Sequence, residues 1–168
     1  HPNISSKAIL SLHFDTENEQ CPPNRATFAD TPEGLAATTN SFFSGPPQTT
    51  ESDLSKLFTP TFTQCDDGNA PSGSRDFPAF VKNIRWLREI LPPGSVNVKV
   101  TLYMRDGNHI AERHSGDPMT MEDGSVVLGE TYMWIELAED GRIEGVVETV
   151  RKMLLKGPTK GEDVKVES

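Results

Sequence analysis

The sequence predicts an α+β fold in which a curved antiparallel sheet cups around three N-terminal helices, as an α+β cone with an internal pocket. Alternating polar and apolar residues, the pattern of half-buried strands, fill most of the stretch 96–151. Two Asp-Gly pairs, Asp106-Gly107 and Asp140-Gly141, separate the strand-like runs, and Asp-Gly favours tight hairpins because both residues tolerate positive φ. Helix-like segments come before this region, and helices that gather on one side of an antiparallel sheet are typical of α+β folds.

The helices and the first strand are predicted from caps, breakers and periodicity. A first helix begins near 30–33, where an N-cap candidate precedes a proline, and ends before the Ser-Gly-Pro-Pro at 44–47. A second, short helix follows 50–53, and a brief strand covers 61–65. The third helix spans 77–91, because its apolar residues recur on one face with the 3.6-residue period of a core helix.

Length and composition indicate one domain with two extensions. A chain of 168 residues is long enough to bury a core. We expect an N-terminal arm at 1–26, an α+β domain at 27–155 and a polar, flexible C-terminal tail at 156–168. The net charge of −9 argues against nucleic-acid binding, which needs basic patches. No membrane partner is expected either, because no apolar run approaches the length of a membrane span.

Several features of the N-terminal part favour secretion. The chain begins at His1 and carries two cysteines, Cys21 and Cys65, and one glycosylation sequon at Asn3. Together they predict a secreted, extracellular glycoprotein whose signal peptide has been removed and whose two cysteines form a disulfide. The alternative is a pair of buried free thiols in a truncated chain. A metal site on the cysteines is not expected, because neither has a second Cys or His close by in the sequence.

A copper site at the first residue is a further alternative. The free amine and imidazole of His1 suit Cu(II), and a second histidine would come from His13, His109 or His114. A histidine left behind by signal-peptide cleavage accounts for the same position, so we predict no metal.

The order of elements resembles that of the SnoaL-like polyketide cyclases, within the nuclear transport factor 2-like (cystatin-like cone) superfamily. The resemblance covers about 27–152 and lies in patterns of apolar and turn residues, which bear on the fold more than on activity. The segments that carry it are LAATTNSFFS (35–44), DLSKLFTPTFTQ (53–64), FVKNIRWLREILPPG (80–94), MRDGNHIAER (104–113) and ELAEDGRIEGVVETV (136–150).

This resemblance implies a bent sheet whose mouth is closed by three helices, no cofactor, and a homodimer formed through the outer face of the sheet. Members of the superfamily include isomerases, cyclases, dehydratases, ligand-binding modules and proteins without catalysis. Catalytic members often carry a histidine just after the second helix and an acidic residue near the end of the last strand. This chain has Thr63, Gln64 and Cys65 at the first position and Glu148 near the second.

Alternation along the last two strands leaves two faces as candidates for the pocket wall. One face mixes aromatic and polar groups, as pocket walls typically do: Glu130, Tyr132, Trp134, Val146 and Glu148. The alternative places Met133, Ile135 and Val147 in the core and leaves Tyr132 and Trp134 at a dimer interface.

The first hairpin also has two possible registers. Alternate residues of 96–104 form an apolar face that we expect to meet the helices. A two-residue turn at 106–107 would place Arg113 inward, whereas a bulged turn would instead bring Glu112 and His114 inward. We expect the first of these registers.

The candidate site follows from these choices. The catalytic candidates are Glu148, Tyr132 and Glu130, and the ligand-binding candidates are Arg113, Trp134, Phe80 and Met104. A carboxylate shielded from water suits general acid–base catalysis near neutral pH, and Tyr132 would donate a hydrogen bond to a carbonyl oxygen that gathers charge. Arg113 would hold a substrate carboxylate or pair with Glu148, and the pairing would make the set structural.

Two functions remain open at this point. The first is binding of a small, mostly apolar molecule in the pocket, with catalysis unproven, and the missing family histidine favours it. The alternative is a cofactor-independent isomerase, cyclase or dehydratase that uses a pocket carboxylate as general acid or base. Both functions involve a small molecule and a homodimer, and neither involves a nucleic acid or a membrane.

Overall fold

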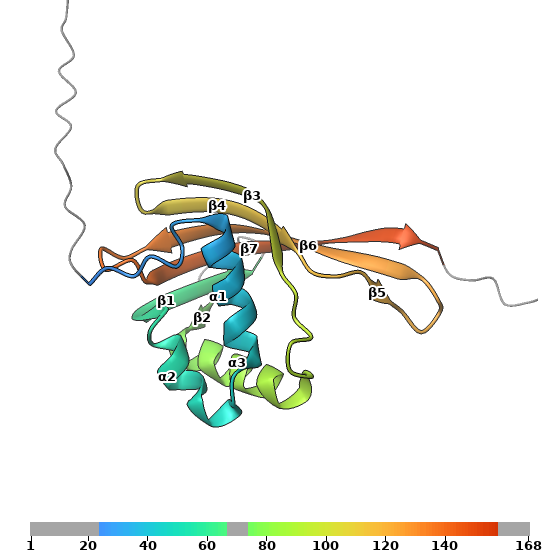
Figure 1. Cartoon of the computed structure of the whole chain (residues 1–168), viewed down its shortest axis with the longest axis horizontal. Coiled ribbons are helices and arrows are strands. Elements are labelled where there is room, and N and C mark those ends of the chain that lie inside the picture. Colours follow the sequence, from blue (N-terminus) through green and yellow to red (C-terminus); the bar gives the residue numbers. More distant parts are fainter. Residues whose placement is uncertain (1–23, 67–73, 158–168) are drawn as a thin grey trace, which may run out of the picture.

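A computed structural model of the chain describes residues 24–66 and 74–157 and shows helices packed against one face of a curved, seven-stranded sheet (Figure 1). This arrangement confirms the predicted α+β fold. Within the described ranges, no helix is long and apolar enough to cross a membrane.

The first and third helices begin where the sequence predicts, whereas the second begins at Thr50, earlier than the predicted start after 50–53, and has no side-chain cap. Helix α1 spans Pro32–Ser44, and the side chain of Thr31 caps it by accepting a hydrogen bond from the Gly34 amide at 3.1 Å. A 3-10 turn, η1 (Pro47–Thr49), leads into the short helix α2 (Thr50–Leu54). Helix α3 spans Phe77–Ile90 and ends one residue earlier than predicted; Asp76 caps it through the Ala79 amide at 3.0 Å.

One sheet contains every described strand. The strands are β1 (Phe58–Asp66), β2 (Arg75–Asp76), β3 (Lys99–Asp106), β4 (His109–Ser115), β5 (Met119–Thr120), β6 (Val126–Leu137) and β7 (Ile143–Lys156). Their order is β2-β1-β7-β6-β4-β3, with β5 paired to β6. Neighbours are antiparallel except β1 and β7, which are parallel. The last strand of the described chain therefore lies in the interior of the sheet.

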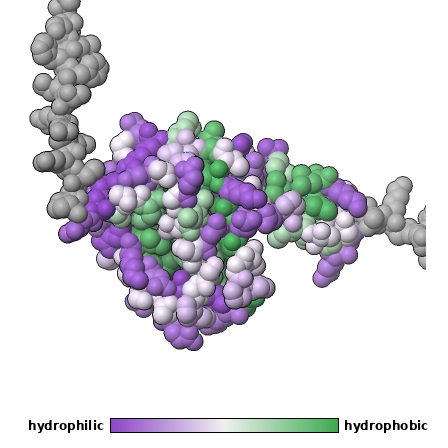
Figure 2. Space-filling model, viewed as in Figure 1, coloured by the Kyte–Doolittle hydropathy of each residue, from purple (hydrophilic) through white to green (hydrophobic). Residues whose placement is uncertain are grey.

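Strands β6 and β7 are longer than their neighbours and project beyond the helices (Figure 1). Strand β1 stops where Asp66 pairs with Glu148, and β4 stops where Ser115 pairs with Glu130. Strand β7 continues to Lys156, beyond the stretch 96–151 in which the sequence shows strand-like alternation. Figure 2 shows apolar surface on this projecting end, where the exposed side chains include Met119, Met121, Leu154 and Leu155.

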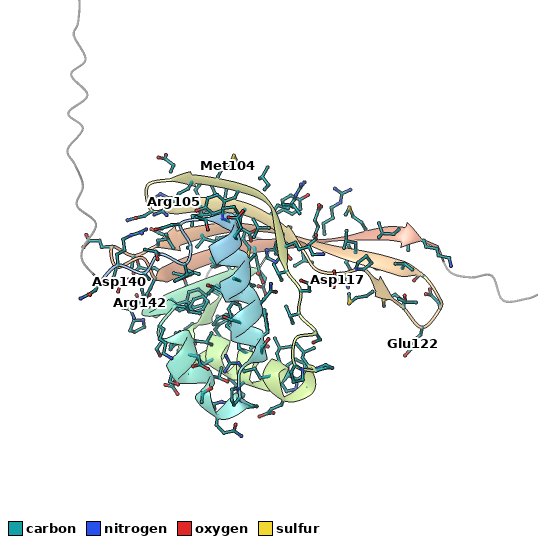
Figure 3. All side chains as sticks on the ribbon, in the orientation of Figure 1. Met104, Arg105, Asp117, Glu122, Asp140 and Arg142 are labelled. Carbon is teal, nitrogen blue, oxygen red and sulfur yellow. The ribbon has the colours of Figure 1, made fainter. Side chains whose placement is uncertain are left out.

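A β-bulge in β3 decides which residues face the helices. Val100 pairs with His114 and Leu102 pairs with Arg113, so Thr101 is the extra residue. The bulge reverses the alternation, and Leu102 and Met104 point to the exposed outer face; Met104 lies on the side away from the helices (Figure 3). The expectation of one apolar inner face along 96–104 was therefore wrong beyond Val100. Tyr103 takes the inner position and packs against the core.

The predicted turn residues behave as expected, but the turn is shifted. Gly107 and Gly141 have φ of 56° and 79°, so both adopt the positive φ that Asp-Gly turns supply. In the first hairpin Asp106 pairs with His109, which leaves Gly107 and Asn108 as the two turn residues. This shift alone would still place Arg113 inward; the bulge at Thr101 is what turns Glu112 and His114 to the inner face, where the less favoured alternative had placed them.

A cluster of phenylalanines forms the centre of the core between the helices and the sheet. The ring of Phe80 on α3 lies 5.0 Å from the rings of both Phe58 and Phe62 on β1, measured between centroids. Phe42 on α1 joins the cluster at 6.3 Å from Phe80. Tilted and edge-on aromatic pairs of this kind add stability beyond the area they bury. The cluster fixes α1 and α3 above the concave face of the sheet.

Arg88 ties the helices together from within the core. Its side chain is 1% exposed, and its Nε donates to the carbonyl oxygen of Phe42 at 2.7 Å, in the last turn of α1. One Nη donates to Pro46 O at 3.0 Å and to the carboxylate of Asp53 at 3.1 Å. A Cβ on Gly45 would lie only 2.8 Å from the guanidinium, so a residue without a side chain is needed there.

Candidate functional site

A cavity of about 260 Å³ lies between the helices and the concave face of the sheet. Its wall is mainly apolar, from α1, α3 and the central strands, and includes Leu35, Phe42, Phe62, Phe80, Ile84 and Ile135. Its size is just below the range of about 300–1,000 Å³ that is typical of drug-sized ligands, so it suits a molecule of one or two rings.

Polar side chains on the concave face of the sheet give the cavity a polar side. Glu112 and His114 come from β4, Gln64 from β1 and Glu148 from β7, and Arg75 lies on the edge strand β2. A mainly apolar wall with a few convergent polar groups is the usual form of a small-molecule site.

Glu112 and His114 form a hydrogen-bonded pair. Nδ1 of His114 lies 2.7 Å from Oε1 of Glu112, and the Glu112 side chain is only 2% exposed. Because an ionised carboxylate can only accept hydrogen bonds, Nδ1 is the donor to it. Because this hydrogen bond occupies Nδ1, the ring nitrogen of His114 that can contact a ligand is Nε2. The second carboxylate oxygen of Glu112, Oε2, is buried and has no hydrogen-bond partner within the described part of the chain.

Glu148 has a different environment on the opposite side of the cavity. Its Oε1 accepts a hydrogen bond from Gln64 Nε2 at 2.8 Å, and Asp66 is its neighbour on β1. Arg75 lies 2.8 Å from Asp66 and pairs with it. Burial raises the pKa of Glu148, and the hydrogen bond to Asp66 and the repulsion from its charge raise that pKa further. The site therefore favours the protonated form of Glu148.

The register of the sheet places the two glutamates on one face. Glu112 pairs with Met133 on β6, and Met133 in turn pairs with Glu148 on β7. Two strand spacings of about 4.8 Å put their Cα atoms about 10 Å apart, with Met133 between them. A ligand that lies over Met133 would therefore contact both carboxyl groups.

Of the residues predicted for the site, the structure places Glu148 and Phe80 in the cavity wall. The five others lie on the outer face of the sheet: Tyr132, Glu130, Arg113, Trp134 and Met104. Trp134 pairs with Val147 and Tyr132 pairs with Thr149, whereas Glu148 belongs to the opposite face.

Three of these outer residues do come together, but away from the cavity. The Tyr132 hydroxyl donates to Glu130 Oε2 at 2.8 Å, and Arg113 Nε lies 3.7 Å from Glu130 Oε1. Arg113 Nε also donates to the hydroxyl of Thr101, the bulge residue, at 2.9 Å. The alternative in which Arg113 pairs with Glu148 is therefore excluded, because the two side chains lie on opposite faces of the sheet.

The sequence analysis did not identify Gln64, Asp66 and Arg75 as candidate site residues. It placed Glu112 and His114 on the inner face only in the less favoured register of the first hairpin. The sequence contains a signal for the last two, since their spacing of two residues puts them on one face of a strand. Which face that is depends on the bulge at Thr101, and no residue pattern marks it.

Several predictions fall on residues that the structure does not describe. Asn3, His1, His13 and Cys21 lie outside the described residues, so the glycan, the copper alternative and the disulfide stay predictions. Cys65 is a free thiol within the described part of the chain. No group of three or more His, Cys, Asp or Glu that could hold a metal ion occurs among residues 24–66 and 74–157.

Solved structures with a similar fold include SnoaL-like and NTF2-fold proteins. A candidate isomerase of the SnoaL-like family from Agrobacterium tumefaciens has a TM-score of 0.50 at 15% identity, over 75% of this chain and 99% of that one. A candidate SnoaL-like polyketide cyclase from Jannaschia sp. CCS1 has a TM-score of 0.53 at 13% identity, over 77% and 88% of the chains. A de novo designed NTF2-fold protein, NT-9, has a TM-score of 0.50 at 12% identity, over 72% and 87%.

These similarities confirm the fold that the sequence resemblance implied: the chain has the α+β cone of SnoaL-like and NTF2-like proteins. No protein-family model matches the sequence, and no curated protein matches it. Identities of 12–15% show the fold alone, and the cone occurs in a designed protein as well as in natural ones. Any function must therefore be argued from the cavity of this chain.

Proposed function

We propose that this protein binds a small, mostly apolar molecule in the cavity between α1, α3 and the sheet. The cavity itself carries the proposal: about 260 Å³ enclosed by aromatic and aliphatic side chains, with polar groups gathered on the sheet side. Burial of an apolar ligand there contributes roughly 25 cal/mol per Å² of its surface, and the polar groups orient it.

Filling part of the cavity should weaken binding. Thr39 on α1 lines the cavity, and its hydroxyl donates only to the Leu35 carbonyl of its own helix. We expect Thr39→Phe to weaken binding of 2-naphthol by about 10-fold or more, since the added ring takes up ligand space and overpacks the wall. Fluorescence titration of 2-naphthol measures the affinity. Ala37→Phe, on the exposed side of the same helix, is the matched control and should bind as the wild type does. Equal affinities in all three proteins would contradict the proposal.

A second candidate function is acid–base catalysis by Glu148, as in a cofactor-independent isomerase, cyclase or dehydratase. The raised pKa of Glu148, caused first by burial and then by Asp66, favours this candidate, because a carboxyl group that titrates closer to neutral pH can both give and take a proton. The proton would move between Glu148 and a carbon next to a carbonyl group of the ligand. Exchange of solvent deuterium into small enolisable ketones tests this chemistry, and loss of exchange in Glu148→Gln is the expected result.

We also propose that the protein forms a homodimer through the outer face of its sheet. We use the name outer apolar face for Leu102, Met104, Tyr132, Trp134 and Val147, which are all substantially exposed on that side. Exposed aromatic and methionine side chains of this kind are typical of protein–protein interfaces. The chemistry of the cavity does not depend on this dimer, because the outer apolar face and the cavity lie on opposite sides of the sheet.

A further inference from the structure

The cavity wall contains a buried carboxylate oxygen without a partner. Glu112 is 4% exposed; its Oε1 contacts His114, and its Oε2 meets no donor within the described residues. Among the described residues, one other buried side-chain nitrogen or oxygen lacks a hydrogen-bond partner, an Nη of Arg25. An unsatisfied buried acceptor costs folding free energy, and a charged one costs more. Such a group therefore calls for a specific explanation.

No basic side chain of the cavity can supply the missing donor. Besides His114, Arg75 is the basic residue among those that line the cavity. Its guanidinium donates hydrogen bonds to Asp66 and Gln64. Arg75 lies on β2, and β1, β7 and β6 separate that strand from β4, which carries Glu112. His114 already uses Nδ1 on the other oxygen of Glu112. The cavity residues on the two strands that pair with β4 are apolar: Val100 on β3, and Met133 and Ile135 on β6.

We propose that the ligand of this cavity is an apolar molecule that bears a hydrogen-bond donor, a hydroxyl or a protonated amine, and that this donor binds Oε2 of Glu112. His114 is then a positioning residue, since its bond to Oε1 holds the carboxylate plane and leaves Oε2 as the oxygen without a partner. This inference deepens the proposed function and rests on it. The apolar wall supplies affinity, and Glu112 supplies selectivity, because a ligand without the donor leaves a buried acceptor unpaired.

Three probes with the same ring system test the donor: 2-naphthol, 2-methylnaphthalene and 2-naphthylmethylamine. We expect the wild type to bind 2-naphthol or the amine about 10- to 100-fold more tightly than 2-methylnaphthalene, the range expected for one hydrogen bond to a charged acceptor. Tighter binding of 2-naphthol would identify the donor as a hydroxyl, and tighter binding of the amine would identify it as an ammonium group. Either result supports the inference.

Substitution of Glu112 separates selectivity from affinity. In Glu112→Leu we expect the preference for the donor probes to fall to about 1-fold while 2-methylnaphthalene still binds, because the apolar wall is intact. Glu136→Leu is the matched control; Glu136 is exposed on the outer face of β6, and this variant should keep the wild-type preference. A preference that survives in Glu112→Leu would overturn the inference.

A stability measurement tests the same idea without a ligand. Replacement of both members of the pair, in Glu112→Leu/His114→Leu, removes the unpaired oxygen and leaves no broken hydrogen bond behind. We expect a higher melting temperature than that of the wild type, as is common where a binding site holds an unpaired polar group. A clearly lower melting temperature would show that the pair is structural and would overturn the inference.

The outcomes also separate this inference from the proposed function. Equal affinity of the wild type for 2-naphthol and 2-methylnaphthalene, with both weakened by Thr39→Phe, would overturn the role of Glu112 and leave cavity binding in place. Binding that Thr39→Phe does not change, or no binding of any of the three probes, would overturn cavity binding and the inference with it.

Discussion

The environment of Glu148 in the folded protein makes the stability that this group contributes fall as pH rises. Because burial and Asp66 raise its pKa, the folded protein holds this proton at pH values where the unfolded chain has lost it. Stability from this group is complete below its ordinary pKa of 4.5 and is lost as pH rises through the raised pKa. Glu148→Gln removes the titration. We expect the variant to be more stable than the wild type above the raised pKa and equal to it below pH 4.5.

Urea unfolding at a series of pH values measures this difference. Asp53 provides an internal reference because its pKa shifts in the opposite direction. A hydrogen bond from Thr49, and to a smaller extent one from Arg88, lowers the pKa of Asp53 below its ordinary value of 3.8. A lowered pKa contributes stability that is present above 3.8 and is lost as pH falls. Glu148→Gln should leave this acid limb unchanged. A stability difference that is constant across the whole pH range would contradict the prediction.

At the scale of single residues, the sequence predicted only part of the site. Phe80 was found because the apolar period of its helix is strong, and Glu148 because it is the acidic residue near the end of the last strand. The other five candidates were assigned to the wrong side of the sheet. A shift of one residue in strand register exchanges the two faces, and the bulge at Thr101 makes such a shift within β3. Glu112 and His114 could therefore be recognised as a pair, but not as cavity residues.

Arg88 determines how firmly the helices are held as a unit. Its guanidinium donates to the carbonyl oxygens of Phe42 in α1 and of Pro46 just after α1, and it pairs with Asp53 on α2. We expect Arg88→Met to lower the free energy of unfolding by about 2–4 kcal/mol, because it leaves acceptors without a donor and a carboxylate without its cation. Urea unfolding measures the change. Arg85→Met, on the exposed face of the same helix, should change the stability by less than about 0.5 kcal/mol; similar losses in the two variants would contradict this role.

At the scale of elements, the local signals were reliable and the long-range pairings were not. Thr31 caps α1 where the sequence placed an N-cap candidate, and α3 begins at Phe77 as predicted, because these start signals are local in the chain. Strand β1 was predicted as 61–65 but spans Phe58–Asp66. Its length depends on parallel pairing with β7, whose residues lie about 80 positions later, and a local pattern carries no information on that pairing.

At the scale of the whole molecule, the outer apolar face predicts self-association. Trp134 lies at its centre and is 54% exposed. We expect the wild type to sediment as a dimer and Trp134→Glu to dissociate it, since a charge at the centre of an apolar contact is desolvated without a partner. Sedimentation velocity measures the populations. Trp86→Glu is the matched control, because Trp86 is equally exposed, at 53%, but lies on α3. A monomeric wild type, or a dimer that survives Trp134→Glu, would contradict the prediction.

The central position of β7 in the sheet affects the order in which the protein can fold during synthesis. Strand β7 bridges β1 and β6 and contributes Val146 and Glu148 to the cavity wall. A chain made from its N-terminus can form α1 and the β3–β4 hairpin early, because their contacts are local, but β1 has no parallel neighbour until β7 has been synthesised. A nascent chain therefore lacks the strand that joins β1 to the rest of the sheet until late in translation. A ligand can stabilise only the finished molecule, and it cannot assist the steps that precede closure of the sheet.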